Sequence, residues 1–244
     1  MIKLKRTIAP LFLNPIESKR LTDLFKATGE AVWNDGRIKE LLLVLSHGKC
    51  AYCECEITTE GKYLEVEHFA NKNKYPDEVI DWNNLLPSCK RCNITKGVHD
   101  VKKEPIVNPF EDYPSVHFSF AAYRFRALTP KGETSSTVMG LNHHSRAVAV
   151  RFEIGEQVQK NIDSALGRLS AYLETPSNLR LRKLVDSVEG VLMESLPSVP
   201  YAATAATVLH AHSDYSLLKA QMEAQGLWNG TLQALHDESH GICL

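Results

Sequence analysis

The sequence lacks the segments that membrane and secreted proteins carry. No stretch approaches the roughly 18 uninterrupted apolar residues of a membrane-spanning helix, and the first residues contain no apolar core of a signal peptide. Neither sign of charge is in excess, since 28 lysines and arginines face 29 aspartates and glutamates. We therefore expect a cytoplasmic protein that does not enter a membrane. Any basic surface for nucleic acid has to be local.

Cysteine is scarce, and its placement is the most informative feature of the chain. Four of the six cysteines form two C-x2-C pairs, Cys50 with Cys53 and Cys89 with Cys92. Pairs with this spacing are typical of a structural zinc site with four thiolate ligands. Cys55 is an alternative ligand because it could replace Cys53, although the C-x2-C spacing matches the second pair better.

The segment between the two cysteine pairs carries residues suited to phosphodiester hydrolysis. That reaction needs an activated water, a cation on the scissile phosphate and stabilisation of the leaving oxygen. His68 is the candidate general base, because a neutral imidazole titrates near working pH. Glu67 offers a carboxylate to a hard cation such as Mg²⁺ or Mn²⁺. Neighbouring side chains on a strand point to opposite faces, so we expect the metal at the strand edge, against a helix.

Two asparagines and a basic run complete the candidate site. Asn84 can hydrogen-bond to backbone and so hold the general base in place. Asn93, directly after the second cysteine pair, can offer a carbonyl oxygen to the catalytic ion or position a water. Each residue alone also suits a turn, a helix cap or a solvated surface, and only their order along the chain favours chemistry. The expected contacts to nucleic-acid phosphates are Lys90, Arg91 and Lys96.

The periodicity of apolar residues predicts a mostly helical α+β fold in three parts. Residues 1–110 hold N-terminal helices and the zinc region, 111–141 form a connector with a small hairpin, and 142–244 form a helical domain. Residues 129–132, Thr-Pro-Lys-Gly, are expected as a turn. The predicted helices span about 15–28, 35–46, 93–96, 142–173, 201–212, 216–225 and 230–237, with one more starting at 177–178 and strands at 62–69, 118–120 and 123–127.

The order of these motifs resembles the HNH endonucleases, the ββα-metal nucleases, in the subgroup whose hairpin is clamped by a four-cysteine zinc. Their pattern reads C-x2-C, Asp-His, Asn-Leu, then C-x2-C followed by His or Asn and a lysine. The resemblance implies a ββα-metal core in which His68 is the general base and Asn84 orients it. Glu67 and Asn93 would hold the catalytic divalent ion. Glu in place of the commoner Asp, and Asn in place of the final His, are expected to loosen metal binding.

A narrower resemblance covers more of the chain. The opening Met1 to Arg6, the Cys-Ala-Tyr-Cys-Glu sequence from Cys50, and the stretch from Trp82 to Cys89 are similar to the PtuB family, the HNH nucleases of Septu anti-phage systems that also accompany some retrons. This implies an endonuclease, with DNA the favoured substrate, in complex with a PtuA-like ATPase of the ABC/SMC type. We expect residues 142–244 to dock on that ATPase, because a nearly neutral chain would bind nucleic acid weakly by itself.

Two other functions stay open at this point. An effector that cleaves RNA, for example tRNA, would have the same architecture, because a one-metal site attacks phosphate rather than base. A non-catalytic zinc-ribbon adaptor would hold nucleic acid through its basic run and would need neither Glu67 nor His68. Substitution of His68 would leave such an adaptor fully functional, which separates it from a nuclease.

Overall fold

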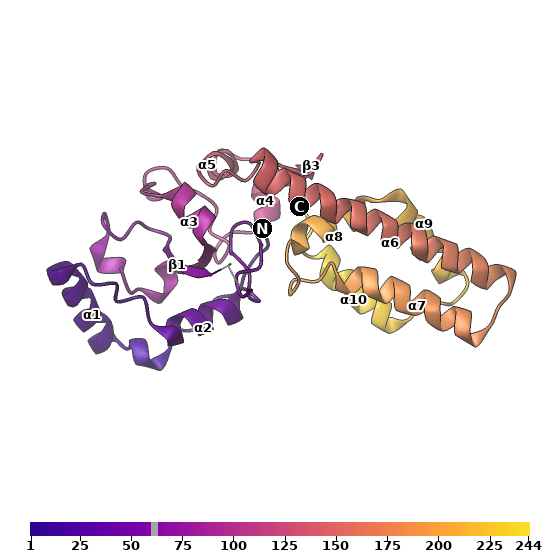
Figure 1. The fold of residues 1–244 in the computed structure, drawn as a ribbon, viewed down its shortest axis with the longest axis horizontal. Helices are drawn as coiled ribbons and strands as arrows, with labels where there is room; N and C mark the ends of the chain where they lie inside the picture. The colour runs from indigo at the N-terminus through magenta and orange to yellow at the C-terminus, as the bar shows by residue number, and fades with distance from the viewer. Residues whose placement is uncertain (60–62) are drawn as a thin grey trace. The chain divides into compact units, whose positions relative to one another are not determined.

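The chain folds into two units, each around a core of its own. The computed structural model describes residues 1–59 and 63–244. Unit 1 comprises residues 1–119 and 125–141, and unit 2 comprises 120–124 and 142–244. Figure 1 shows a mostly helical chain. The described strands form two small two-stranded sheets, which confirms the mostly helical α+β class. Among the described residues, none of the helices combines the length and apolar character that crossing a membrane requires.

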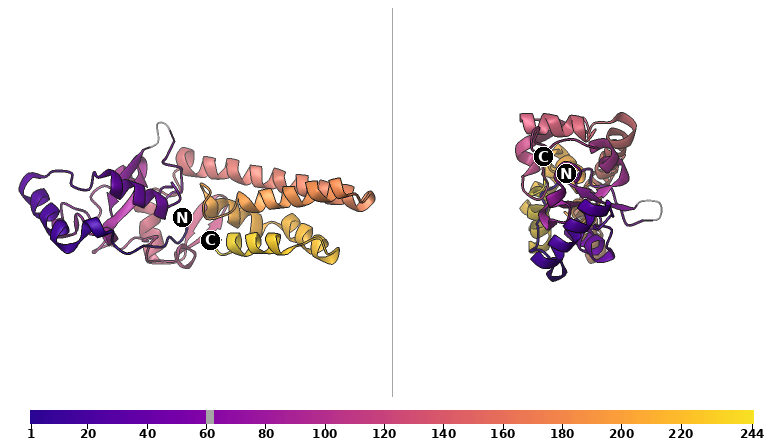
Figure 2. Two further views of the ribbon diagram at one scale, coloured as in Figure 1. Left: turned by 90° about the horizontal axis from the view of Figure 1, so that it is seen from below. Right: turned by 90° about the vertical axis from the view of Figure 1, so that its left-hand side faces the viewer.

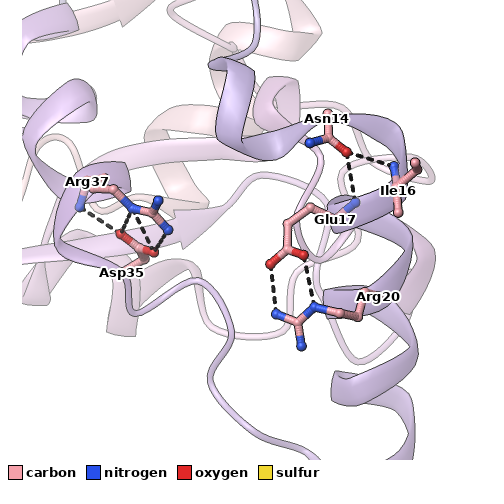
Figure 3. A network of polar contacts seen from close by, with 6 residues as sticks. All are labelled: Asn14, Ile16, Glu17, Arg20, Asp35 and Arg37. Atoms are coloured by element: carbon pink, nitrogen blue, oxygen red, sulfur yellow. Dashed lines mark hydrogen bonds and ion pairs between the residues drawn. The ribbon is translucent and has the colours of Figure 1, made fainter.

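The first two helices have strong local signals at their ends. The Asn14 side chain caps α1 (Pro15–Thr28) by accepting two hydrogen bonds, each 3.0 Å, from backbone N–H groups of the first turn. Gly29 ends α1 with a φ of 75°, which a glycine adopts without strain. The Asp35 side chain caps α2 (Gly36–Leu45) in the same way, at 2.8 Å (Figure 3). Both predicted helices are therefore confirmed.

A ββα arrangement follows α2. Strands β1 (Leu64–His68) and β2 (Leu85–Cys89) pair antiparallel, with His68 opposite Leu85, and α3 (Lys90–Lys96) begins directly after β2. The predicted strand began at Lys62, which lies outside the described residues. Helix α2 packs against both strands. The buried core of unit 1 around this sheet consists of Leu13, Ile38, Leu42, Val66, Val79, Ile80, Trp82 and Leu85.

The predicted turn at residues 129–132 is wrong. The turn of the second hairpin lies at Ala122 and Tyr123, both with positive φ, between β3 (Phe118–Ala121) and β4 (Arg124–Ala127). Thr129 instead caps α5, with its Oγ1 accepting a hydrogen bond of 3.1 Å from the N–H of Gly132. A Thr-Pro pair suits a helix start as well as a turn, since proline is favoured at the first helical position. Further short helical elements of unit 1 are η1 (Leu11–Leu13), η2 (Pro76–Glu78), η3 (Trp82–Asn84), α4 (Pro114–His117) and α5 (Pro130–Val138).

Unit 2 is a helical bundle. A π-helical turn, His144–Val148, leads into the long helix α6, where a continuous helix from 142 was predicted. Helices α6 and α7 run side by side in Figure 2, and α8, α9 and α10 pack with them around a core that includes Ile162, Leu184 and Leu209. The helices are α6 (Ala149–Glu174), α7 (Asn178–Met193), α8 (Ala202–Ala211), α9 (Ser213–Ala224) and α10 (Gly230–His240).

The tip of the β3–β4 hairpin belongs to unit 2. Tyr123 packs against Gly155 of α6 so closely that a Cβ at residue 155 would come within 2.3 Å of the tyrosine ring. Phe152, one turn earlier on α6, meets the same ring edge-on at a centroid distance of 5.3 Å. A larger residue at position 155 would therefore have to displace the tyrosine ring.

Candidate functional site

The two cysteine pairs meet in unit 1. Cys50 and Cys53 follow α2, Cys89 ends β2, and Cys92 lies in α3. Their four Sγ atoms all lie within 4.8 Å of one another, and the Sγ atoms of Cys53 and Cys89 are 3.8 Å apart. Zinc–sulfur bonds of about 2.3 Å in a tetrahedron place sulfurs about 3.8 Å apart. The set is consistent with a structural zinc, and it contains Cys53 rather than Cys55.

His68 is buried at the end of β1. Its Nε2 lies 2.9 Å from the backbone oxygen of Val79. A carbonyl can only accept a hydrogen bond, so Nε2 carries the proton and Nδ1 keeps a free lone pair. Burial lowers the pKa of His68 to about 4, with the positive charges of Lys72 and Lys96 acting in the same direction. His68 is therefore neutral at pH 7 and can accept a proton at Nδ1.

Glu67, the neighbour of His68 on β1, is also buried but faces α3. Its Oε1 pairs with the Nζ of Lys96 at 2.7 Å, and the same ammonium donates to the backbone oxygen of His68 at 2.9 Å. Burial raises the pKa of Glu67 to about 7, although Lys96 opposes the shift. The expected surface contact of Lys96 with phosphate is corrected accordingly. Only 3% of Lys96 is exposed, because its ammonium neutralises a buried carboxylate.

Asn84 joins two backbone segments beside His68. Its Oδ1 accepts a hydrogen bond of 2.6 Å from the N–H of Ala70. Its Nδ2 donates at 3.0 Å to the oxygens of both Ala70 and Glu78. Residue 78 directly precedes Val79, whose oxygen holds the imidazole. Asn84 thus fixes the backbone next to the residue that holds the His68 ring.

The remaining predicted site residues lie on α3. Asn93 is half-buried and precedes Lys96 by three residues, which places both on one face of the helix. From this face of α3 Lys96 reaches the carboxylate of Glu67. Lys90 and Arg91 are exposed in the first turn of α3.

Tyr52, between the first two cysteines, is a buried polar residue that the sequence reasoning did not single out. Its side chain is fully buried, and among the described residues its hydroxyl has no hydrogen-bond partner. Burial raises the pKa of Tyr52, and the charge of Glu67 adds to the shift. The donors present, a carboxylate and an amide oxygen on one side of α3, suit Mg²⁺ or Mn²⁺.

The opposite pKa shifts of the two β1 residues predict opposing pH dependences of stability. In the folded protein the pKa of His68 lies below its ordinary 6.5. The stability that this residue contributes is therefore lost as pH falls from about 6.5 to 4. In the folded protein the pKa of Glu67 lies above its ordinary 4.5. The stability that this residue contributes is therefore lost as pH rises from about 4.5 to 7. Replacing His68 by phenylalanine removes one contribution and leaves the other.

As pH rises from roughly 5.5 to 7, the free energy of unfolding of the His68→Phe variant should fall by about 1 kcal/mol relative to that of wild type. Urea unfolding of zinc-loaded protein without Mg²⁺ or Mn²⁺ measures this difference. Every other titrating group is common to the two proteins and cancels. Parallel pH curves for the two proteins would show that His68 is not buried in its neutral form.

Fold and site together define a class: a four-cysteine ββα unit with a buried histidine and carboxylate on its first strand, joined to a helical bundle. No family model matches the chain, and no solved structure matches it. The chain is 40% identical over 237 residues to a Septu protein PtuB of Bacillus thuringiensis, covering 96% of this chain and 92% of that protein. A Septu protein PtuB of Bacillus mycoides (strain KBAB4) is 28% identical over 83% of this chain and 88% of its own length. The chain belongs to the PtuB family of Septu proteins.

Proposed function

We propose that this protein is a metal-dependent HNH endonuclease that hydrolyses phosphodiester bonds of nucleic acid, with DNA favoured. It would act as the effector of an anti-phage complex with a PtuA-like ATPase of the ABC/SMC type. One observation carries the proposal: a buried, neutral His68 with its Nε2 proton fixed on Val79 and Nδ1 free, next to Glu67 in a ββα unit. Membership of the PtuB family supports the Septu context.

In the proposed reaction His68 acts as the general base. Its Nδ1 accepts a proton from the attacking water, while the bond between Nε2–H and Val79 fixes the ring. The attack on phosphorus expels the 3′ oxygen, which takes up a proton from solvent. Mg²⁺ or Mn²⁺, held by Glu67 and Asn93, would stabilise the charge that develops on the phosphate and the leaving oxygen. Glu67 has to leave Lys96 and be deprotonated to serve as a ligand.

The helical bundle is proposed to dock on the ATPase. Unit 2 exposes large apolar side chains although its own core is complete. Phe152, Leu179 and Met193 are about half-exposed, at 48%, 53% and 50%. We propose that exposed side chains such as these contact the ATPase. Cleavage by the isolated chain at the rate of the complex would contradict this part of the proposal.

A specific observation also favours the non-catalytic adaptor. Lys96 already neutralises Glu67 in the described structure, so a divalent ion has to compete with a buried ion pair for this carboxylate. An adaptor would keep the pair at all metal concentrations. Metal titration separates the two functions.

The test is cleavage of supercoiled plasmid, and of structured RNA in parallel, over a range of Mn²⁺ concentrations. The chain is assayed alone and with the ATPase. Wild type should cleave, and Asn93→Ala should need at least about tenfold more Mn²⁺, because it loses one oxygen ligand of the ion. Asn93 is half-buried in α3, so its truncation should preserve the fold.

Asn73→Ala, at an exposed loop position, is the matched control and should behave as wild type. Cleavage of RNA alone would move the proposal to an RNA-cleaving effector. Absence of cleavage of either substrate in the presence of the ATPase would leave the adaptor. A wild-type Mn²⁺ dependence in Asn93→Ala would remove Asn93 from the metal site.

A further inference from the structure

The buried cation of the site is already neutralised. Lys96 pairs with Glu67, and two further lysines of unit 1, Lys74 and Lys102, are paired as well. Lys74 bonds the carboxylate of Asp100 at 2.9 Å, and Lys102 pairs with Glu78. Lys72 is different, because among the described residues it forms no ion pair with a carboxylate. A half-buried lysine without a carboxylate partner next to a candidate general base needs an explanation.

Lys72 is held by an aromatic ring that also contacts His68. Its Nζ lies 4.9 Å from the ring centroid of Trp33. Trp33 comes from the segment between α1 and α2 and meets the imidazole of His68 edge-on, at a centroid distance of 4.7 Å and an angle of 87°. Phe25 supports the indole from α1 at 5.7 Å. The ammonium of Lys72 is therefore carried by the same rigid group that packs the general base.

The loop that bears Lys72 is ordered by its own hydrogen bonds. The Oδ1 of Asn71 accepts from the N–H of Asn73 at 2.9 Å, and the oxygen of Asn71 accepts from the N–H of Tyr75 at 2.8 Å. Tyr75 in turn donates its hydroxyl proton to Asp100 at 2.8 Å. A cation on a loop fixed at several points loses little further entropy when it binds an anion.

The charge of Lys72 lies close to His68. One indole ring, that of Trp33, carries the ammonium of Lys72 and also packs edge-on against the imidazole. Lys72 can supply there the positive charge that Lys96 does not.

We propose that Lys72, held over the indole of Trp33, binds a phosphate of the nucleic-acid substrate beside His68 and Glu67. The proposal rests on the proposed nuclease function and adds to it a phosphate subsite on the loop that follows β1. The contact is electrostatic, so arginine can replace lysine here but a neutral side chain cannot.

The test is binding of fluorescein-labelled duplex DNA to the full chain without Mg²⁺ or Mn²⁺, followed by anisotropy over a range of NaCl concentrations. Lys72→Ala should bind about tenfold more weakly at low salt, and the slope of log affinity against log salt should be smaller by about one. Lys72→Arg should bind as wild type. Lys160→Ala, which removes one charge from an exposed position on α6, is the matched control and should change affinity less than about twofold.

An equal loss of affinity in Lys72→Ala and Lys160→Ala would overturn the proposal, as would a wild-type salt slope in Lys72→Ala. Zinc content and thermal unfolding of each variant exclude misfolding as the cause. Because the measurement is binding without catalysis, it is independent of cleavage. If cleavage depends on His68 but Lys72→Ala binds DNA as wild type does, the phosphate subsite is overturned and the nuclease function stands. If DNA binding depends on Lys72 but the protein does not cleave, the nuclease function is overturned and the subsite stands.

Discussion

Replacement of His68 by alanine is expected to lower plasmid cleavage at least about 100-fold, the usual lower end for loss of a general base. The reason lies in the fixed tautomer: Val79 holds the Nε2 proton, so Nδ1 is the one site in the ring that can accept a proton from water. The burial that lowers the pKa of His68 to about 4 also keeps this nitrogen unprotonated down to mildly acidic pH. Initial rates of plasmid nicking with Mn²⁺ and the ATPase measure the effect.

The control for this variant is His143→Ala. His143 is exposed at the N-terminal end of the π-helical turn in unit 2 and caps it without a side-chain hydrogen bond. It should cleave as wild type. Zinc content and thermal unfolding of His68→Ala establish that the fold survives the loss of the ring against Trp33. More than a tenth of wild-type activity in a folded, zinc-loaded His68→Ala would show that another group activates the water.

Loss of zinc is expected to unfold unit 1 and to leave unit 2 folded. Zinc binding by small thiolate sites is worth about 10–16 kcal/mol, more than the stability of most domains. The thiolates of Cys50, Cys53, Cys89 and Cys92 join the end of α2 to β2 and α3, so without the metal nothing equivalent holds the ββα unit together. The bundle has a separate core and should keep its helices.

Cys89→Ser, or a strong chelator, should therefore shift the fluorescence of Trp33 and Trp82, which lie in unit 1, and keep much of the helical circular dichroism. Plasmid cleavage should be lost with the same dependence on chelator. Cys243→Ser, in unit 2, is the control and should leave fluorescence and zinc content unchanged. A zinc-free protein with wild-type tryptophan fluorescence would mean that unit 1 folds without the metal.

Features encoded by neighbouring residues could be predicted from the sequence. Asn14 with its following proline, and Gly29, set the ends of α1 through contacts within one turn. The C-x2-C spacing likewise predicted which four cysteines converge, because within each pair the two thiols are brought together by neighbouring residues. The strand that carries Glu67 and His68 was predicted from its own residues, whereas the pairing with β2 followed only from the resemblance to the ββα-metal nucleases.

What the sequence could not give depends on packing between distant segments. Trp33 and Lys72 are far apart in sequence, and only the fold places them around His68. Lys96 looked like a surface cation because it follows other basic residues, but α3 turns it toward a buried carboxylate. In the sequence Tyr52 is only part of the Cys-Ala-Tyr-Cys motif. Its burial, without a hydrogen-bond partner for its hydroxyl among the described residues, is apparent only in the folded structure.

The hairpin tip at Tyr123 has a consequence for dissecting the protein. Residues 120–124 belong to unit 2, whereas the strand residues on either side belong to unit 1, so no single cut in the sequence separates the two units. A fragment that starts at residue 142 would lose the tyrosine ring that packs on Gly155 and meets Phe152 of α6 edge-on. The bundle is thus completed by a five-residue insertion from earlier in the chain, and a free-standing version of it has to carry a substitute for that aromatic cover.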